Sequence, residues 1–222
     1  MDGGIQCFPA LGRAICFYAA RPCRGMDGQT PTQITAAGLD GWYGTLSDPD
    51  KVRLRRYLDS DASSAESFLL GVMAGAQEDH NFRLAVTAGA YALTLDLDDM
   101  ETFRVREAYI DGLAAAGMYD EAKAQCELNL DLFPSVRDAV LAENGGKLPA
   151  GIMCRNRLID ILVGVDHDYD AADAALDAFV EIGAMDPDEL AYRKQSLKIH
   201  KMQRAFDNIF IGKKERSPSR PP

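Results

Sequence analysis

Three acids in an alternating pattern are the first candidates for chemistry. Asp166, Asp168 and Asp170 have the spacing with which an EF-hand calcium loop begins. The sixth position of such a loop needs Gly and the twelfth needs a bidentate Glu, but here they hold Ala171 and Asp177. We therefore expect no calcium site and interpret the acids as caps at a turn between two helices.

A second group of acids surrounds a predicted helix start: Asp96, Asp98, Asp99 and Glu101. Carboxylates at such a start are stabilised by free backbone amides and by the helix dipole. A catalytic pair of carboxylates needs a cleft and two opposed environments, and the sequence shows neither. We therefore predict that these acids cap a helix.

The histidines form no catalytic pattern. His80 and His167 occupy the same place in the repeat described below, which favours a structural role at a turn over a metal ligand or a general base. His200 lies between Lys198 and Lys201, so we expect it to be solvated.

The cysteines are odd in number and lack the paired spacing of zinc sites. Cys126 takes the place of a packing residue in a predicted helix and is expected to be buried and inert, which leaves Cys154 as the remaining candidate nucleophile. The other three are Cys7, Cys16 and Cys23. With no Gly-rich phosphate loop and no GxSxG elbow, the chain is predicted to be non-catalytic, with no cofactor and no metal.

Composition favours helices and an acidic body. The 31 Ala and 22 Leu outnumber the 27 residues of Val, Ile and Thr about two to one. The net charge is −10, but residues 187–222 carry +5, so the rest carries −15. An acidic body repels nucleic acid and anionic membranes, and no apolar run is long enough to span a bilayer. We expect a cytoplasmic protein with reduced thiols.

The pattern along the chain predicts helix after helix. Residues 1–25 are expected to be disordered, or to be an extension that the natural protein lacks. Residues 26–62 are expected to form N-terminal helices, and residues 63–186 a repeat region. A long capping helix is expected over 187–211, ended by Gly212, and a disordered basic tail over 212–222. A capping box of Ser63 and Glu66 is predicted to open the repeat region. The expected helices are 32–45, 49–58, 66–77, 82–97, 100–116, 119–132 ended by Pro134, 135–143, 150–165, 169–183 and 187–211.

One pattern occurs three times in the repeat region. Its clearest copy begins with a turn glycine, Gly117, and an aromatic residue two positions on, Tyr119, which is expected to fill the gap beside that turn. A small residue, Ala122, follows three positions later. A Leu-rich stretch with Leu130 and Leu132 then precedes Pro134. The upstream copy places Phe82, Ala85, Leu93 and Leu95 at the matching positions, and the downstream copy places Tyr169, Ala172, Val180 and Ile182.

This pattern resembles the tetratricopeptide-repeat (TPR) family over about 120 residues. The aromatic residues lie 37 and then 50 residues apart, where the family expects about 34, and the inserted segment 135–149 explains the larger gap. The resemblance implies an all-α fold of stacked antiparallel helical hairpins, a TPR-like α-solenoid, flanked by N-terminal helices and a C-terminal capping helix. A single hairpin cannot bury its apolar side, so the copies must share one interior.

In TPR proteins the first helix of each hairpin lines a concave groove that binds peptides or partner helices. The resemblance therefore implies a non-catalytic interaction or scaffold protein with an unidentified protein or peptide partner. From the composition we expect no membrane contact, and a homo-oligomer is left open. Carried over position by position, the groove residues are Ser67, Leu70, Ala74, Gln77, Glu78, Arg104, Glu107, Asp111, Arg157 and Ile161.

The alternative is contact with nucleic acid or an anionic surface through the basic C-terminal end, although nucleic acid is disfavoured by the acidic body. A solvated capping helix and tail is the simpler interpretation of these cations. The candidates are Lys198, Lys201, Arg204, Lys213, Lys214 and Arg216.

Overall fold

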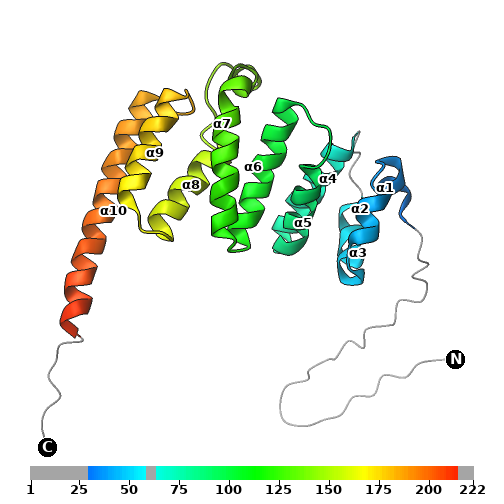
Figure 1. Cartoon of the computed structure of the whole chain (residues 1–222), viewed down its shortest axis with the longest axis horizontal. Helices are drawn as coiled ribbons and strands as arrows, with labels where there is room; N and C mark the ends of the chain where they lie inside the picture. The colour runs from blue at the N-terminus through cyan, green and yellow to red at the C-terminus, as the bar shows by residue number, and fades with distance from the viewer. Residues whose placement is uncertain (1–29, 59–63, 215–222) are drawn as a thin grey trace, which may run out of the picture.

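The chain is all-helical wherever the structure is defined. The computed structural model describes residues 30–58 and 64–214, with side chains of the last helix described as far as Asp207. Within these ranges every regular element is a helix, as predicted, and Figure 1 shows the helices side by side in a row. The expectations for residues 1–25 and for the end of the tail, 215–222, lie outside the described residues.

The helices follow one another through short turns. Their bounds are α1 Thr32–Ala36, α2 Asp40–Thr45, α3 Asp48–Leu54 continued by a 3-10 turn at Arg55–Tyr57, α4 Ala65–Glu78, α5 Phe82–Ala92, α6 Asp99–Ala115, α7 Tyr119–Glu143, α8 Met153–Gly164, α9 Tyr169–Glu181 and α10 Pro187–Lys214.

The N-terminal helices differ from the prediction in two places. The single helix expected over 32–45 is wrong, because the chain breaks at Gly38, whose φ of 70° is left-handed, and restarts as α2. This break turns Leu39 into the core, where it is 1% exposed. The cap of α4 is Ser64, which accepts a hydrogen bond from the Ser67 amide at 3.1 Å, and Ser63 lies outside the described residues.

Pro134 does not end a helix, which corrects the predicted break between 119–132 and 135–143. One continuous helix, α7, contains it. The proline removes the amide that would bond to the Leu130 carbonyl, at a cost of about 3 kcal/mol. Continuing the helix buries Val136 and Val140, 3% and 4% exposed, and two buried valines contribute about 3–6 kcal/mol. Tertiary burial therefore outweighs the local cost.

The last helix also runs further than predicted. It was expected to end at Gly212, but α10 continues through this glycine to Lys214. A single glycine inside a helix costs only about 1 kcal/mol relative to alanine, which does not by itself break the helix.

The turns of the three predicted copies share a residue with left-handed φ, although the third turn is one residue longer and closes with a hydrogen bond from the Asp168 amide to the Leu162 carbonyl. His80, Gly117 and His167 have φ of 56°, 76° and 56°, in the left-handed region where glycine is usual. After His80, the Asn81 amide bonds to the Ala76 carbonyl oxygen at 2.7 Å, and after Gly117 the Met118 amide bonds to that of Leu113 at 2.9 Å. The predicted turn role of the two histidines is confirmed.

The second helix of each copy begins at the predicted aromatic residue. Phe82, Tyr119 and Tyr169 are the first residues of α5, α7 and α9. The small residue three positions on is fully or almost fully buried in every copy: Ala85, Ala122 and Ala172. Tyr119 itself is 40% exposed, so the aromatic residue at this position is only partly buried.

Helix α6 occupies the centre of the packing. It contacts α4 and α5 on one side and α7 and α8 on the other. The buried side chains form three clusters, and α6 contributes Val105 to the first, Phe103 and Ile110 to the second, and Tyr109 and Leu113 to the third. The interior is thus joined through one helix.

Replacing Gly89 tests the contact between α5 and α6. A Cβ atom there would lie 2.6 Å from the Tyr109 Cδ2 atom and 2.9 Å from the Met73 sulfur. Gly89→Ala should lower the free energy of unfolding by about 1–3 kcal/mol in urea titrations, because overpacking exceeds the gain in helix propensity. Gly41→Ala, in α2 with nothing within 4 Å, should be neutral or stabilising. Equal effects at both sites would contradict the close contact.

Candidate functional site

The predicted groove residues lie on α4, α6 and α8, and half of them bond to another helix. Gln77 of α4 donates a hydrogen bond to the Ala108 carbonyl of α6 at 3.0 Å. Arg104 of α6 pairs with Glu143 at the end of α7. Glu107 and Asp111, also on α6, bond to α8. Their side chains are therefore already engaged within the protein.

Glu107 joins three helices through one carboxylate. It accepts hydrogen bonds from the Cys154 amide at 2.8 Å and from the Met153 amide, the first two amides of α8. The Asn129 side chain, from α7, donates to it at 2.9 Å. The residue before α8, Ile152, has no side chain that could cap the helix. The Glu107 carboxylate therefore takes the place of a local cap, and it lies at the positive end of the α8 dipole.

Arg157 and Asp111 form the second link between α6 and α8. The Nε and Nη2 atoms of Arg157 lie 3.0 and 2.5 Å from Asp111 Oδ1. Asp160, one turn further along α8, accepts from Arg157 Nη1 at 3.3 Å. The hydrogen bond with Asp111 raises the pKa of Arg157 further above its ordinary value. The guanidinium therefore stays charged and oriented.

The remaining predicted groove residues are divided between solvent and core. Ala74 and Glu78 are exposed at the end of α4, and Ser67 and Leu70 are half-buried at its start. Ile161 was predicted to face a partner, but only 2% of its surface is exposed. It packs into the small cluster of α6, α7 and α8, because close packing of these helices places it beneath the surface.

A recess of about 330 Å³ opens above Ile161, between the ends of α6 and α8 and the start of α7. Two predicted groove residues, Arg157 and Ile161, take part in it. Tyr119 and Val165 line it and are 40% and 42% exposed. The remaining lining residues are Ala114, Ala115, Asp160 and Gly164. A pocket of this size, apolar with a few polar groups, is at the lower limit of small-ligand sites.

The acids considered for calcium have separate partners. Asp168 caps α9 by accepting from the Ala171 amide at 2.9 Å, which confirms the capping role. Asp166 pairs with Lys123 at 2.7 Å and Asp170 with Lys201 at 2.7 Å. Across the described residues no group of three His, Cys, Asp or Glu side chains could hold a metal ion.

The second group of acids also caps a helix, as predicted. Asp98 accepts from the Glu101 amide at 2.8 Å, and the Glu101 side chain accepts from the Asp98 amide at 3.0 Å, which completes a capping box at α6. Asp99 accepts a hydrogen bond from the Ser135 hydroxyl at 2.9 Å.

Both described cysteines are unsuited to nucleophilic chemistry. Cys126 and Cys154 are free thiols with no exposed surface. Burial raises the pKa of Cys126 to about 12, and burial beside Glu107 raises the pKa of Cys154 further. A thiol reacts as the thiolate, so Cys154 does not have the environment of a nucleophile.

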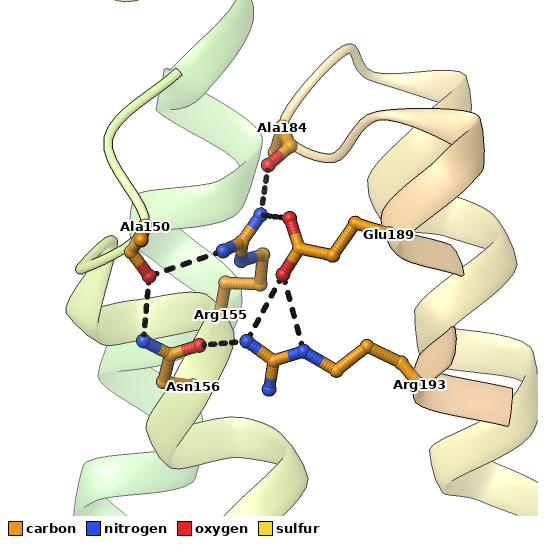
Figure 2. A network of polar contacts seen from close by, with 6 residues as sticks. All are labelled: Ala150, Arg155, Asn156, Ala184, Glu189 and Arg193. Atoms are coloured by element: carbon orange, nitrogen blue, oxygen red, sulfur yellow. Dashed lines mark hydrogen bonds and ion pairs between the residues drawn. The ribbon is translucent and has the colours of Figure 1, made fainter. Parts of the chain in front are cut away.

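A buried arginine that sequence reasoning did not single out connects α8 to α10. Arg155 is 1% exposed and donates to the Ala184 carbonyl at 2.8 Å and to Glu189 at 3.1 Å. Figure 2 shows Arg193 completing the network, with bonds to Glu189 and to Asn156. Burial lowers the pKa of Arg155, and the ion pair with Glu189 opposes this effect. Every described partner in this network is internal, which indicates a structural role.

The basic C-terminal candidates are only partly available to a ligand. Lys201 is bonded to Asp170, whereas Lys198 is exposed and Arg204 is half-buried. The side chains of Lys213 and Lys214, and all of Arg216, lie outside the described residues. None of the described helices has the length and apolar character needed to cross a bilayer.

No protein-family model matches this chain, and searches of curated proteins and of solved structures found no match either.

Replacing Glu107 distinguishes a structural from a ligand-binding role. Glu107→Gln removes the charge that the Met153 and Cys154 amides stabilise, so the free energy of unfolding should fall by about 1–2 kcal/mol in urea titrations. Glu78→Gln, at an exposed groove position, should change it by less than about 0.5 kcal/mol. Indistinguishable values for the two variants would show that Glu107 does not hold α8.

Proposed function

We propose that this protein is a TPR-like helical repeat protein of the cytoplasm that binds a peptide or partner helix without catalysis. The observation that carries the proposal is the recurrence of one left-handed turn residue and one packing position in three successive hairpins. The hairpins are α4–α5, α6–α7 and α8–α9, and within each the two helices pack together.

The recurrence extends from sequence to conformation. A residue with left-handed φ lies between the two helices of each hairpin, an aromatic residue begins the second helix, and a buried alanine follows three residues later. Two histidines adopt a conformation that costs most residues about 1–2 kcal/mol. Its retention at equivalent positions supports a common hairpin rather than three unrelated turns.

The first helices of the hairpins support a shared inner surface. Helix α4 packs on α6, and α6 packs on α8, in addition to the contacts between consecutive helices. Among the described elements, α5–α7 and α7–α9 are not closely packed pairs. Closer contact on one side curves a row of hairpins toward that side, so α4, α6 and α8 would line the concave face.

The recess above Ile161 is the best place on this face for a ligand side chain. Most of its lining residues are apolar, and among them Tyr119 and Val165 are 40% and 42% exposed. Arg104 and Arg157 are paired with Glu143 and Asp111, so neither is free to recognise a carboxylate. The bound segment should therefore offer an apolar anchor, with basic residues beside it to suit the acidic body.

Selection from a random peptide library displayed on phage tests this proposal. Selected peptides should carry an apolar anchor and bind the purified chain in fluorescence anisotropy. Val165→Lys places a charged side chain at the edge of the recess and should weaken binding at least tenfold, as burying an unpaired charge costs more than about 1.4 kcal/mol.

Val52→Lys is the matched control, since Val52 is 50% exposed on α3 and takes no part in the recess. It should leave the affinity unchanged. Enrichment of no peptide, or equal binding of the selected peptides to both variants, would refute the peptide site at the recess.

A further inference from the structure

Helix α10 has one face against the protein and another covered by nothing that the structure describes. On the inner face, Leu197 is 7% exposed and lies in the core with the partly buried Leu190. Lys194 bonds to Asp177 at 2.8 Å, and Lys201 bonds to Asp170 at 2.7 Å, both acids of α9. These contacts recur every three to four residues and fix which side of α10 faces α9.

The outer face carries a stripe of large apolar side chains. Tyr192, Ile199, Met202 and Phe206 are 72%, 49%, 52% and 57% exposed. Their spacing of seven, three and four residues places Tyr192, Ile199 and Phe206 at the a positions of a heptad and Met202 at a d position. We call these four residues the α10 stripe. The heptad spacing is that of a seam between two helices in a coiled coil.

The stripe continues onto a part of α10 that α9 does not support. Asp170, in the first turn of α9, already pairs with Lys201, so Met202 and Phe206 lie beyond the level at which α9 begins. Figure 1 shows the last turns of α10 running past the other helices. An isolated helical segment is marginal in water, and apolar residues along it are stabilised when a second helix covers them.

We propose that the α10 stripe is the interface of an antiparallel homodimer, in which α10 of one protomer packs along α10 of another. The same surface then serves both protomers around a two-fold axis, as in most dimers. In this register Ile199 lies level with Met202 of the partner subunit. Gln195, the other d position in the stripe, lies level with Phe206 of the partner subunit.

Charge complementarity selects a second copy in the antiparallel direction. The first turn of α10 contains the exposed Asp188, while Glu189 beside it is held by Arg155 and Arg193 of the same chain. Sequence positions 213 and 214 at the other end of the helix are lysines. Antiparallel pairing brings the acidic end of each helix level with the basic end of the other, whereas parallel pairing would align like charges.

The same charges argue against a bilayer as the occupant. Lys194 and Lys201 are held by acids of α9, so among the described residues the stripe has one exposed lysine beside it, Lys198, against two exposed acids. Asp188 precedes Tyr192 by one turn on the same side and is exposed, as is Asp207 next to Phe206. An anionic lipid surface would be repelled by both acids, and helices that lie in a membrane interface place lysines or arginines there instead.

The mass of the full chain in solution tests the dimer. In light scattering coupled to size-exclusion chromatography, the wild type should have twice the chain mass, and the dimer should dissociate on dilution. Ile199→Glu should weaken dimerisation at least a hundredfold, because each interface would receive two carboxylates close to its axis. Leu128→Glu is the matched control: Leu128 is 51% exposed on α7, and this variant should remain dimeric. Circular dichroism should be the same for all three proteins.

Cross-linking tests the direction of pairing. With Cys7, Cys16 and Cys23 changed to serine, Gln195→Cys and Phe206→Cys chains should be joined by a short bis-maleimide only when the two are mixed. Cross-linking of either variant to itself would indicate a parallel dimer and overturn the antiparallel register.

Two results would overturn the dimer itself. One is a dimer that persists in Ile199→Glu. The other is a wild-type monomer at high concentration, whether or not it sediments with vesicles of phosphatidylserine and phosphatidylcholine. If the wild-type monomer sediments with these vesicles and the Ile199→Glu variant does not, the α10 stripe binds a lipid surface instead. The test is independent of peptide binding at the recess, because Ile199 lies on α10 and the recess is formed by α6, α7 and α8.

Discussion

The arrangement of the central helices depends on one carboxylate. Glu107 of α6 accepts hydrogen bonds from the first two amides of α8 and from the Asn129 side chain of α7. The first amides of a helix have no intrahelical acceptor, and α8 has no capping side chain of its own. Helix α8 is therefore positioned by a residue 46 positions earlier in the chain, and the pair of Asp111 and Arg157 fixes its direction relative to α6.

This constraint explains how an open row of helices can present a defined recess. Glu107 holds the start of α8 on α6, and Arg157 holds its middle, so the ends of both helices lie at a fixed separation beside the start of α7. Ile161 closes the floor. Glu107 and Arg157, which were expected to contact a partner, thus hold the helices that form the recess. In the proposed complex the partner would instead contact the apolar surface of Tyr119 and Val165.

The local patterns of the sequence predicted most of the helices, the capping role of the acids around Asp98, and the turn role of His80 and His167, because short-range backbone hydrogen bonds determine each of these features. The capping box that was predicted, of Ser63 and Glu66, is not the cap of α4, which is Ser64. Pro134 was misread because burial of Val136 and Val140 is not visible locally. The groove positions came from a resemblance, which places Glu107 on the correct helix but cannot show that α8 uses its carboxylate. The internal ion pair of Arg155 and Glu189 joins residues 34 positions apart, and no spacing rule covers such a distance.

Residue-resolved hydrogen exchange of the native chain tests the central claim most directly. If Glu107 caps α8, the Met153 and Cys154 amides should exchange as slowly as amides in the middle of α8. The Asp120 and Glu121 amides are the internal reference, since they occupy the first turn of α7, which has no side-chain cap, and should exchange quickly. Exchange of Met153 and Cys154 as fast as that of Asp120 and Glu121 would contradict the account.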